Sequence, residues 1–490
     1  MADVLIQEFN ETFIRILTEP GIEAELQEKF TFYADNYKFN PRYRNRQWDG
    51  KIRLYNKRTK QIYKGLLADI EQFCIENDYT VTYDGDFSTD EFSIKEATDF
   101  IKTLNLPDFI ELRDYQIETF ATCIKNKRRL FVSPTASGKS LILYFIYRYL
   151  KKKTLLIVPT INLVNQMESD MIEYGYTGKI HKIQGGTAKD DSDANLYVST
   201  YQSLVSMPDE YFEQFDVILG DESHKWKSKS LIDIMQKATT VKYKFGFTGT
   251  LSESTVNALV LTGLFGKIEQ IVTTRELIDA GHLSEINIKA ICLGYKDDVK
   301  SAYHKELRKI TDKTKKYAHE IDFLVSNEAR NRFIKNLALS LPGNGLILFN
   351  RVDSHGIPLH AAIEASTDKP VYLVHGDTGS DDREYIRRIV NTHTDSITLG
   401  SMGVFAEGTN IPNINWIILS HPSKSKIKVL QMIGRGLRKS ETKSTFTLFD
   451  ISDDLSLKKN VNYTLTHFGE RIRYYIQEKF NYKIFRVTLK

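Results

Sequence analysis

The sequence contains only three cysteines in 490 residues, and these (Cys74, Cys123 and Cys292) lie far apart without any CxxC pair. An odd number of widely spaced cysteines argues against a disulfide framework and against a zinc site, and it fits a reducing cytoplasm. Long hydrophobic runs are also missing, because charged residues interrupt every apolar stretch well before the roughly 18 positions of a membrane span. The first residues show no basic segment followed by an apolar one, so we expect no secretion signal.

A strong net charge is missing as well. The total of +4, from 67 basic and 63 acidic residues, is too small to indicate a partner, although the charges are unevenly distributed. The hydrophobic content of 41% and the charged content of 27% are ordinary for a globular protein. A chain of this length predicts roughly two to four domains.

Residues 1–95 are expected to form a small α+β domain, with strands in VLIQEF and TFIRIL and a helix within residues 63–77. Between them, residues 37–60 carry nine basic residues and one acid, with five interleaved aromatic residues. Basic side chains neutralise phosphates and aromatic rings stack on bases, so this pattern favours nucleic-acid contact over a solvated basic hairpin whose aromatics form its core. The predicted contacts are Arg42, Arg44, Arg46, Trp48, Lys51 and Arg53.

The polar, acidic stretch at residues 85–106 predicts a linker. Beyond it, apolar strands alternate with helices in two series, the first starting with the strand at Leu130 and the second after about Ser284. Such alternation predicts parallel sheets covered by helices on both faces. We therefore expect α/β domains at residues 96–283 and 284–460, a ligand site between them, and a helix and strand at 461–490 packed on the second domain.

The segment LFVSPTASGKS (130–140) combines a short apolar strand, a turn and the start of an apolar helix. This is the geometry of a phosphate-binding loop, in which Lys139 reaches the β and γ oxygens and the hydroxyl of Ser140 holds Mg²⁺. Ser133 stands where the usual motif has its first glycine. The alternative is an ordinary turn before a helix.

Two further segments suit the same chemistry. The apolar strand in FDVILGDESH ends in Asp221 and Glu222, which would hold Mg²⁺ and deprotonate the attacking water, unless they are merely a solvent-facing pair. Upstream, the amide of Gln116 would select ATP by both donating to and accepting from adenine, although a surface glutamine is the simpler interpretation.

In QMIGRGLR, residues 431, 435 and 438 have the spacing of one helical face. Two guanidinium groups presented together suit a γ-phosphate, and the alternative is a basic helix lying on solvent or nucleic acid.

Nine motifs in order, from Leu112 to Lys439, resemble those of superfamily 2 helicases: LRDYQ, SPTASGKS, VPTINLVNQ, STYQS, DESH, FTGT, ILFNRVDSHG, LGSMGVFAEGTNIPN and QMIGRGLRK. The segments ADNYKFNPRYRNRQWDGKIRL and EKFNY are similar to those of the UvsW helicases of T4-like phages. The resemblance implies two tandem RecA-like parallel-sheet domains and a small α+β nucleic-acid-binding domain. It also implies an ATP- and Mg²⁺-dependent enzyme in the host cytoplasm that unwinds or branch-migrates forks, Holliday junctions and R-loops in phage recombination, repair and replication.

The resemblance also assigns roles to individual residues. Arg113 and Gln116 would contact adenine. The phosphates and Mg²⁺ would be bound by Gly138, Lys139 and Ser140, together with Pro134, Thr135, Ala136 and Ser137. Asp221 would be the metal ligand and Glu222 the catalytic base. His224, Thr248 and Thr250 would couple hydrolysis to domain movement, with Gly408, Glu407 and Asn410 between ATP and the strand. Gln431 would bind near the γ-phosphate, and Arg435 and Arg438 would be arginine fingers. Pro159, Thr160, Thr200, Asn350 and Arg351 would hold the phosphate backbone.

The partners expected from this resemblance are branched or duplex DNA and RNA–DNA hybrids, with recombination or single-strand-binding proteins as accessories to a monomer and no membrane contact. Three alternatives stay open: an RNA helicase, the motor subunit of a restriction system, and a non-catalytic nucleic-acid-binding scaffold. The last would require a broken phosphate loop or missing arginines, and the sequence has both intact.

Overall fold

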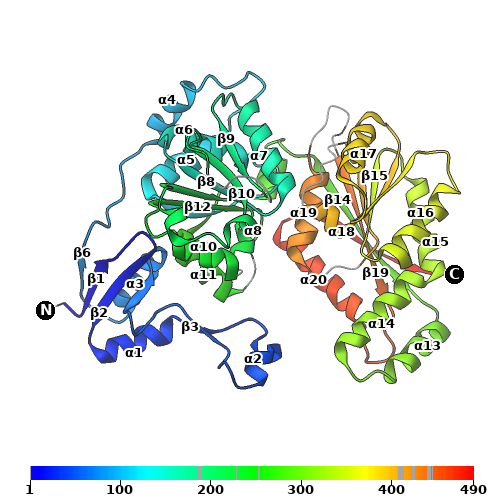
Figure 1. Ribbon diagram of the computed structural model, residues 1–490. Helices are drawn as coiled ribbons and strands as arrows, with labels where there is room; N and C mark the ends of the chain where they lie inside the picture. Colours follow the sequence, from blue (N-terminus) through cyan, green and yellow to red (C-terminus); the bar gives the residue numbers. More distant parts are fainter. Residues whose placement is uncertain are drawn as a thin grey trace. The chain divides into compact units, whose positions relative to one another are not determined.

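The computed structural model describes residues 2–184, 190–227, 229–251, 254–406, 413–421, 425–438, 443 and 445–489 (Figure 1). The chain divides into two compact units, Met1–Val272 and Thr273–Lys490. Each unit contains a seven-stranded sheet, and the first also carries two smaller sheets, of four and two strands, at its N-terminal end. In the described part of the chain, no helix has the length and apolar content needed to cross a bilayer.

The N-terminal module is a four-stranded mixed sheet in the order β5-β2-β1-β6, with helices α1 and α3. Its elements are β1 (Val4–Glu8), β2 (Phe13–Thr18), α1 (Pro20–Lys29), β5 (Gln61–Tyr63), α3 (Leu67–Glu76) and β6 (Val81–Asp84). Alternating burial along β1 and β2 places Val4, Ile6, Ile14 and Ile16 in the core, as expected for strands with one covered face. The strands and the helix predicted for this region are confirmed.

A basic arm, residues 34–53, projects from the module. It leaves through β3 (Thr31–Tyr33), forms the 3₁₀ turn η1 (Tyr37–Phe39) and the short helix α2 (Pro41–Arg44), and returns through β4 (Lys51–Arg53). Strands β3 and β4 pair with each other as a separate two-stranded sheet. The arm therefore has a defined backbone.

The N-terminal module is docked onto the first large sheet. Ile6, Ile14 and Leu66 belong to the same buried cluster as Trp226 and Phe265 of the large domain. The junction also contains the buried ammonium group of Lys244, which donates to the carbonyl of Glu11 (3.1 Å), the hydroxyl of Thr12 (2.7 Å) and the carbonyl of Ala238 (2.8 Å). Burial, together with the nearby charge of Arg128, lowers the pKa of Lys244, and the three acceptors satisfy the hydrogen-bonding capacity of its buried amine.

The first large sheet is entirely parallel and has the order β13-β7-β12-β11-β8-β10-β9. Its strands are β7 (Arg128–Val132), β8 (Thr154–Val158), β9 (Ile180–Ile183), β10 (Leu196–Thr200), β11 (Val217–Gly220), β12 (Tyr243–Thr248) and β13 (Ile268–Gln270). The helices are α5 (Asp114–Asn126), α6 (Lys139–Leu150), α7 (Ile161–Glu173), α8 (Tyr201–Leu204), α9 (Asp209–Phe212), α10 (Lys229–Lys237) and α11 (Thr255–Phe265). Every residue of β8, β10 and β11 is buried, which explains their continuous apolar sequences.

Two boundaries differ from the prediction. The expected linker contains a helix, α4 (Ile94–Lys102), which begins with a capping box between Ser93 and Glu96 and buries Ala97 and Ile101. Its polar outer face, with two acidic and two basic residues, concealed the helical spacing of these two residues in the sequence. Strand β7 begins at Arg128 instead of Leu130, because ion pairs to Glu11 and Glu269 allow the arginines at 128 and 129 to lie within the sheet.

The second unit contains another parallel sheet, in the order β16-β17-β15-β18-β19-β14-β20. Its strands are β14 (Glu285–Gly294), β15 (Gly345–Phe349), β16 (Val371–Val374), β17 (Ile397–Ser401), β18 (Trp416–Leu419), β19 (Thr445–Asp454) and β20 (Asn481–Thr488). Its helices are α12 (Thr274–Asp279), α13 (Asp297–Arg308), α14 (Lys313–Ser326), α15 (Glu328–Ser340), α16 (Ile357–Glu364), α17 (Ser380–Thr392), α18 (Met402–Ala406), α19 (Lys426–Gly436) and α20 (Tyr463–Gln477). The predicted fold class, two tandem RecA-like sheets with a small N-terminal domain, is confirmed.

The C-terminal residues form part of this second sheet. Strand β20 pairs in parallel with β14 at the edge of the sheet. Helix α20 is fixed by a fully buried ion pair in which Arg471 donates to both carboxylate oxygens of Asp450, at 2.7–3.0 Å. The hydroxyl of Tyr475 donates to the same carboxylate at 2.9 Å. The C-terminal segment is therefore anchored through charge as well as through packing.

Candidate nucleotide site and nucleic-acid surface

Strand order brings the predicted nucleotide-binding residues together in the first unit. Strands β7, β12 and β11 are adjacent, and their carboxyl ends lead into the phosphate loop, Thr248 and Asp221 respectively. Ligands of open α/β folds bind at this edge. Three segments, the first and last of which lie more than 100 residues apart in sequence, therefore meet at one site.

Side chains at the N-terminal ends of α5 and α6 hold the phosphate loop (133–138) in place. Arg113 donates to the carbonyl of Ala136 (3.0 Å), and the hydroxyl of Tyr115 donates to the carbonyl of Ser137 (2.8 Å). The ammonium group of Lys139 donates to the carbonyl of Ser133 (3.1 Å). Pro134, Thr135 and Ser140 are half-buried around this network. The loop is thus preorganised at the N-terminus of α6, where the helix dipole favours phosphate.

The structure explains why the loop can have Ser133 where the usual phosphate-loop motif has its first glycine. Left-handed backbone occurs in the loop at Ala136 (φ 66°) and Gly138 (φ 79°), and Ser133 is not among the described residues with positive φ. Its buried hydroxyl instead donates to Ser137 within the loop. Glycine is favoured at position 138 by the positive φ, and a Cβ there would also force the side-chain nitrogen of Gln116, 2.2 Å away, to shift.

Gln116 is almost fully buried and bonded at both ends of its amide. The nitrogen donates to the carbonyl of Ser137 (3.0 Å), and the oxygen accepts from the backbone of Arg113 (3.1 Å). This geometry gives Gln116 a direct part in fixing the phosphate loop. Recognition of adenine by Gln116 and Arg113 stays a prediction.

The acid pair lies immediately after β11. Asp221 is buried, and desolvation together with the neighbouring carboxylate of Glu222 raises its pKa. Burial would also raise the pKa of Glu222, but the imidazole of His224, 3.1 Å away, and the charge of Lys139 outweigh it, so its pKa is lowered. Glu222 also adopts left-handed backbone (φ 49°), which costs a residue with a Cβ of order 1 kcal/mol or more. The lowered pKa keeps Glu222 ionised and therefore able to accept a hydrogen bond from a water molecule, while the pKa of its neighbour Asp221 is raised.

The three predicted coupling residues are in contact. Nδ1 of His224 lies 3.0 Å from Oγ1 of Thr248, and that hydroxyl donates to the carbonyl of Thr250 at 2.9 Å. His224 belongs to the turn η3 (Ser223–Lys227) that carries the acid pair's sequence motif, and Thr248 ends β12. Hydrogen bonds therefore connect the turn that follows the acid pair directly to the motif that contains Thr248 and Thr250.

The protein side chains at this site would coordinate Mg²⁺ only together with oxygen ligands from the nucleotide phosphates. In the described residues, no group of three or more His, Cys, Asp or Glu side chains could hold a metal by itself. Asp221 accepts one backbone bond, from Glu222 (2.9 Å), and the hydroxyl of Ser140 is bonded to the hydroxyl of Tyr174 (2.8 Å). One carboxylate and one hydroxyl are a typical protein contribution to Mg²⁺ bound with a nucleotide.

In the second unit, the predicted shared face of Gln431, Arg435 and Arg438 is wrong for its last member. Helix α19 ends at Gly436, so Arg438 lies beyond it. Gly436 has no Cβ, which leaves room for the ring of Phe446, and glycine also weakens the helix at this point. Gln431 and Arg435 are half-buried on α19, and Gly408, with Glu407 and Asn410, lies outside the described residues.

The residues predicted to hold a phosphate backbone follow strand ends. Pro159 and Thr160 follow β8, and Thr200 ends the adjacent β10, on the edge that also carries the phosphate loop. In the second unit, Asn350 and Arg351 follow β15 and are exposed. Asn350 lies 3.4 Å from the buried imidazole of His421, and Arg351 pairs with Asp322 at 3.5 Å.

The basic arm exposes Arg42, Arg44 and Arg46, whereas some of its aromatics pack on one another. Tyr37 stacks on Tyr33 (centroids 4.5 Å apart) and meets Tyr43 edge-on (4.9 Å).

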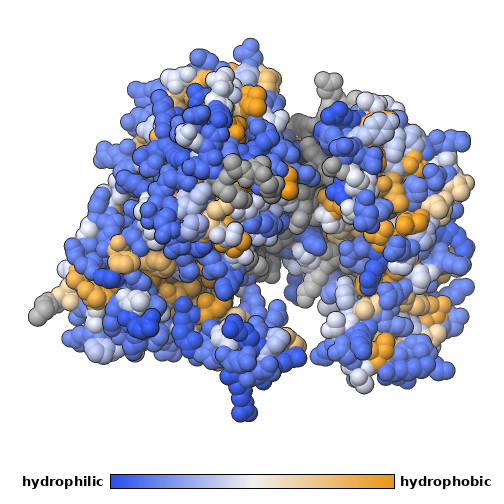
Figure 2. Space-filling view, in the orientation of Figure 1, coloured by the Kyte–Doolittle hydropathy of each residue, from blue (hydrophilic) through white to orange (hydrophobic). Residues whose placement is uncertain are grey.

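The other side chains of the arm divide between internal contacts and solvent. Trp48 donates to the carbonyl of Lys51 (2.9 Å), and Arg53 pairs with Asp49. Phe39 is 70% exposed, and the surface over α2 is mostly hydrophilic in Figure 2. The aromatics are thus partly core, and the exposed arginines and Phe39 are the groups available to a ligand.

Sequence reasoning missed two side chains that touch the nucleotide site. Tyr115 lies within LRDYQ and holds the loop through its hydroxyl, so its polar group at a motif position was the available signal. Tyr174 bonds Ser140 from the end of α7, 34 residues away, and no local pattern indicates that contact.

Comparisons with protein families cover most of the chain. A family model described as "DNA helicase UvsW, N-terminal" matches residues 3–84, one described as "Type III restriction enzyme, res subunit" matches 109–253, and one described as "Helicase conserved C-terminal domain" matches 328–440. The first covers the N-terminal module with its arm, and the second contains the phosphate loop and acid pair.

Individual proteins are similar over greater lengths. The chain is 34% identical over 515 aligned positions to the ATP-dependent DNA helicase uvsW of Enterobacteria phage T4, covering 99% of this chain and 100% of that protein. The crystal structure of T4 UvsW matches with a TM-score of 0.52 at 33% identity over the whole of both chains. The DNA-bound type ISP restriction-modification enzyme LlaBIII is similar in fold (TM-score 0.58, 14% identity), but the match spans only 34% of it.

Proposed function

Because the chain belongs to the UvsW family of ATP-dependent DNA helicases, we propose that it is an ATP-driven motor that unwinds or branch-migrates branched DNA. The observation that supports this most directly is a preorganised phosphate loop beside a buried acid pair, in a unit that also carries the exposed arginines of the arm. Forks, Holliday junctions and R-loops are the proposed substrates, in the cytoplasm of a bacterial host.

Hydrolysis is proposed to proceed within the site on the first sheet. The loop and the N-terminus of α6 bind the phosphates, and Lys139 leaves its carbonyl partners to contact the β and γ oxygens. Glu222, ionised by its surroundings, takes the proton of the attacking water. Ser140 and Asp221 would hold Mg²⁺, which neutralises charge developing on the phosphates. Gln431, Arg435 and Arg438 are proposed to reach the γ-phosphate when the two units close on ATP.

Coupling to DNA is proposed to run through the strand-end residues. Pro159, Thr160 and Thr200 on one unit and Asn350 and Arg351 on the other would each grip the phosphate backbone. The contact of His224 with Thr248 would report the state of the nucleotide to the motif ending in Thr250. Opening and closing of the units then moves one grip past the other, as expected for a motor whose conformational steps follow ATP turnover.

The substitution Lys139→Ala tests the nucleotide site. We expect it to nearly abolish DNA-stimulated ATP hydrolysis, because the charge that faces the β and γ oxygens is lost, while DNA binding stays largely intact. Steady-state hydrolysis with forked DNA and fluorescence anisotropy of the same DNA measure the two quantities. Full activity in the variant would show that the site is misassigned.

Charge reversal at Arg42, Arg44 and Arg46 tests the arm. We expect weaker binding of forked DNA and a shallower dependence of log Kd on log salt, because fewer counterions are released. Reversal at Lys305, Arg308 and Lys313, which are exposed on α13 and α14, makes the same charge change elsewhere. An unchanged salt slope in the arm variant, or an equal loss of slope in the control, would contradict the assignment.

Substrate preference separates DNA from RNA motors. ATP hydrolysis and unwinding over forks, Holliday junctions, R-loops, plain duplex DNA and single-stranded RNA should rank branched DNA first. Stronger stimulation by single-stranded RNA would favour an RNA helicase of the same superfamily instead.

A further inference from the structure

Helix α11 connects the N-terminal module to the hydrolysis motifs. It begins at Thr255, shortly after the motif that contains Thr248 and Thr250, and ends at Phe265, next to the turn that follows the acid pair. The module contacts α11 near both of its ends, as the following contacts show. A helix held in this way can be displaced by whatever acts on the module.

The first contact lies at the base of the basic arm. The carboxylate of Asp35 accepts hydrogen bonds from the hydroxyl of Ser254 (3.0 Å) and from the amide of Asn257 (2.9 Å), across 219 and 222 positions of sequence. Ser254 is also the N-cap residue of α11. Asp35 therefore ties the arm to the helix start, only four residues beyond Thr250.

The second contact is a close approach of backbone to backbone. A Cβ on Gly65 would lie 2.2 Å from the carbonyl oxygen of Thr262 and 2.5 Å from that of Gly263, so only glycine allows this distance. Opposite it, a Cβ on Gly263 would lie 2.9 Å from the ring of Tyr63. The hydroxyl of Tyr63 accepts a hydrogen bond from Gln236 of α10 at 2.7 Å, so the tyrosine is bonded as well as packed.

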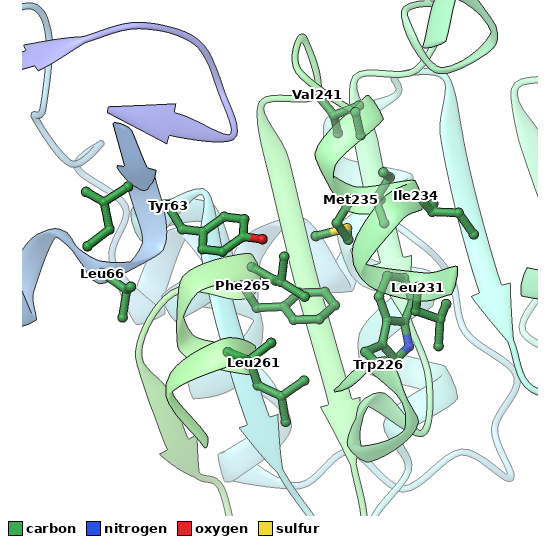
Figure 3. Close-up of a cluster of buried hydrophobic side chains, with 14 of the residues drawn as sticks. Tyr63, Leu66, Trp226, Leu231, Ile234, Met235, Val241, Leu261 and Phe265 are labelled. Carbon is green, nitrogen blue, oxygen red and sulfur yellow. The ribbon is translucent and has the colours of Figure 1, made fainter. Parts of the chain in front are cut away.

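From α11 the packing continues to the catalytic turn. Phe265 meets the indole of Trp226 edge to face, with ring centroids 5.0 Å apart, and Trp226 is 2% exposed. Trp226 in turn fills the space beside Gly220, where a Cβ would lie 2.7 Å from the indole. Figure 3 shows Tyr63, Phe265 and Trp226 following one another through the cluster, with Leu66 and Leu261 beside them. Gly220 directly precedes Asp221, so this packing ends at the acid pair.

We propose that Asp35 and Gly65 are positioning residues for DNA-stimulated hydrolysis: through α11 they transmit DNA binding at the basic arm to Glu222 and to the turn η3 that follows it and contains His224. The inference rests on the proposed function, because it takes Glu222 as the catalytic base. Close-packed contacts transmit small displacements instead of absorbing them. A shift of about 1 Å in a catalytic group changes hydrolysis by as much as two orders of magnitude.

The test uses the full chain and compares ATP hydrolysis with and without forked DNA in one preparation. An inactive, misfolded fraction of the protein lowers both rates by the same factor and leaves their ratio unchanged. We expect Asp35→Ala and Gly65→Ala each to lower this ratio at least about fivefold. Glu28→Ala and Gly21→Ala are the matched controls, because Glu28 is an exposed acid on α1 and a Cβ on Gly21 meets nothing within 4 Å.

DNA affinity excludes the simpler explanation of weaker binding. Asp35→Ala removes a negative charge beside the arm, so its Kd for forked DNA should stay equal or fall while stimulation is lost. Combining Gly65→Ala with reversal of Arg42, Arg44 and Arg46 should lower stimulation no further than the arm variant alone at saturating DNA, because both changes interrupt one route.

Several results would overturn the inference. Stimulation in Asp35→Ala that matches the Glu28→Ala control would do so, and since Asp35 is exposed this variant is not at risk of misfolding. Independent, multiplicative losses in the combined variant would do so too. Glu222→Gln distinguishes failure of this inference from failure of the proposed function. If that variant still hydrolyses ATP, the proposed function itself is wrong.

Discussion

Removal of one charge from the buried pair between Arg471 and Asp450 should destabilise the second unit strongly. Both side chains are completely buried, and three hydrogen bonds of 2.7–3.0 Å join them. In Arg471→Met the carboxylate of Asp450 stays buried, and among the described residues the hydroxyl of Tyr475 is the side-chain donor that remains bonded to it. Breaking a buried pair in this way costs about 3–5 kcal/mol.

The loss is large enough to measure by calorimetry. For a unit of about 200 residues, each 1 kcal/mol shifts Tm by about 2–4 °C, so we expect Arg471→Met to lower the Tm of the second unit by about 6–20 °C. Proteolysis within α20 and β20 should also become faster, because the pair joins α20 to β19.

Two further variants define the cause. Lys309→Met breaks a pair with Glu306 whose partners are 64% and 51% exposed, and such a surface pair contributes about 0–1 kcal/mol. Arg471→Met combined with Asp450→Leu leaves no unpaired charge and should recover most of the lost stability. A Tm for Arg471→Met within about 2 °C of the wild-type value would show that the buried pair contributes little to the stability of the second unit.

Two other predictions concern the phosphate loop and α19. Ser133→Gly, which restores the usual motif, removes a buried hydrogen bond to Ser137 worth about 1 kcal/mol. We therefore expect ATP binding to weaken by about threefold to tenfold in a fluorescent-nucleotide titration. Tighter binding would contradict this prediction. Burial lowers the pKa of Lys443, which donates to the carbonyl of Gly436, to about 8. Between pH 8 and the ordinary pKa of lysine, the side chain of Lys443 is therefore protonated in the unfolded chain but not in the folded protein. The stability of the wild type relative to Lys443→Met should rise with pH across that range, as measured by thermal melts at several pH values.

Local chemistry explains why much of the site could be predicted. A strand, a turn and GKS at a helix start form one continuous segment, and the acid pair directly follows an apolar strand, so each motif carries its own structural context. Parallel strands covered on both faces must be apolar throughout, which made β8, β10 and β11 recognisable. These features depend on neighbours within about ten residues.

The rest depends on tertiary contacts that no local pattern contains. Whether Ser133 can replace glycine is decided by the φ angle the loop adopts against α5. The importance of Gly65 depends on a helix some 200 residues away, and nothing near it in sequence indicates close approach. Charged residues such as Arg471 and Lys244 would be placed on the surface by any pattern rule, yet both are buried because distant residues supply their partners.

The bonding of Lys244 has a consequence for how such chains can diversify. Two of its three acceptors, Glu11 and Thr12, belong to the N-terminal module, whereas Lys244 itself lies on β12 of the ATPase sheet. Recombination that joined this ATPase sheet to a foreign N-terminal module would leave the buried amine of Lys244 with one of these three partners, a cost of several kcal/mol. Exchange of DNA-binding modules among relatives is therefore limited to pairs that match at this one junction, and the two parts are expected to be inherited together.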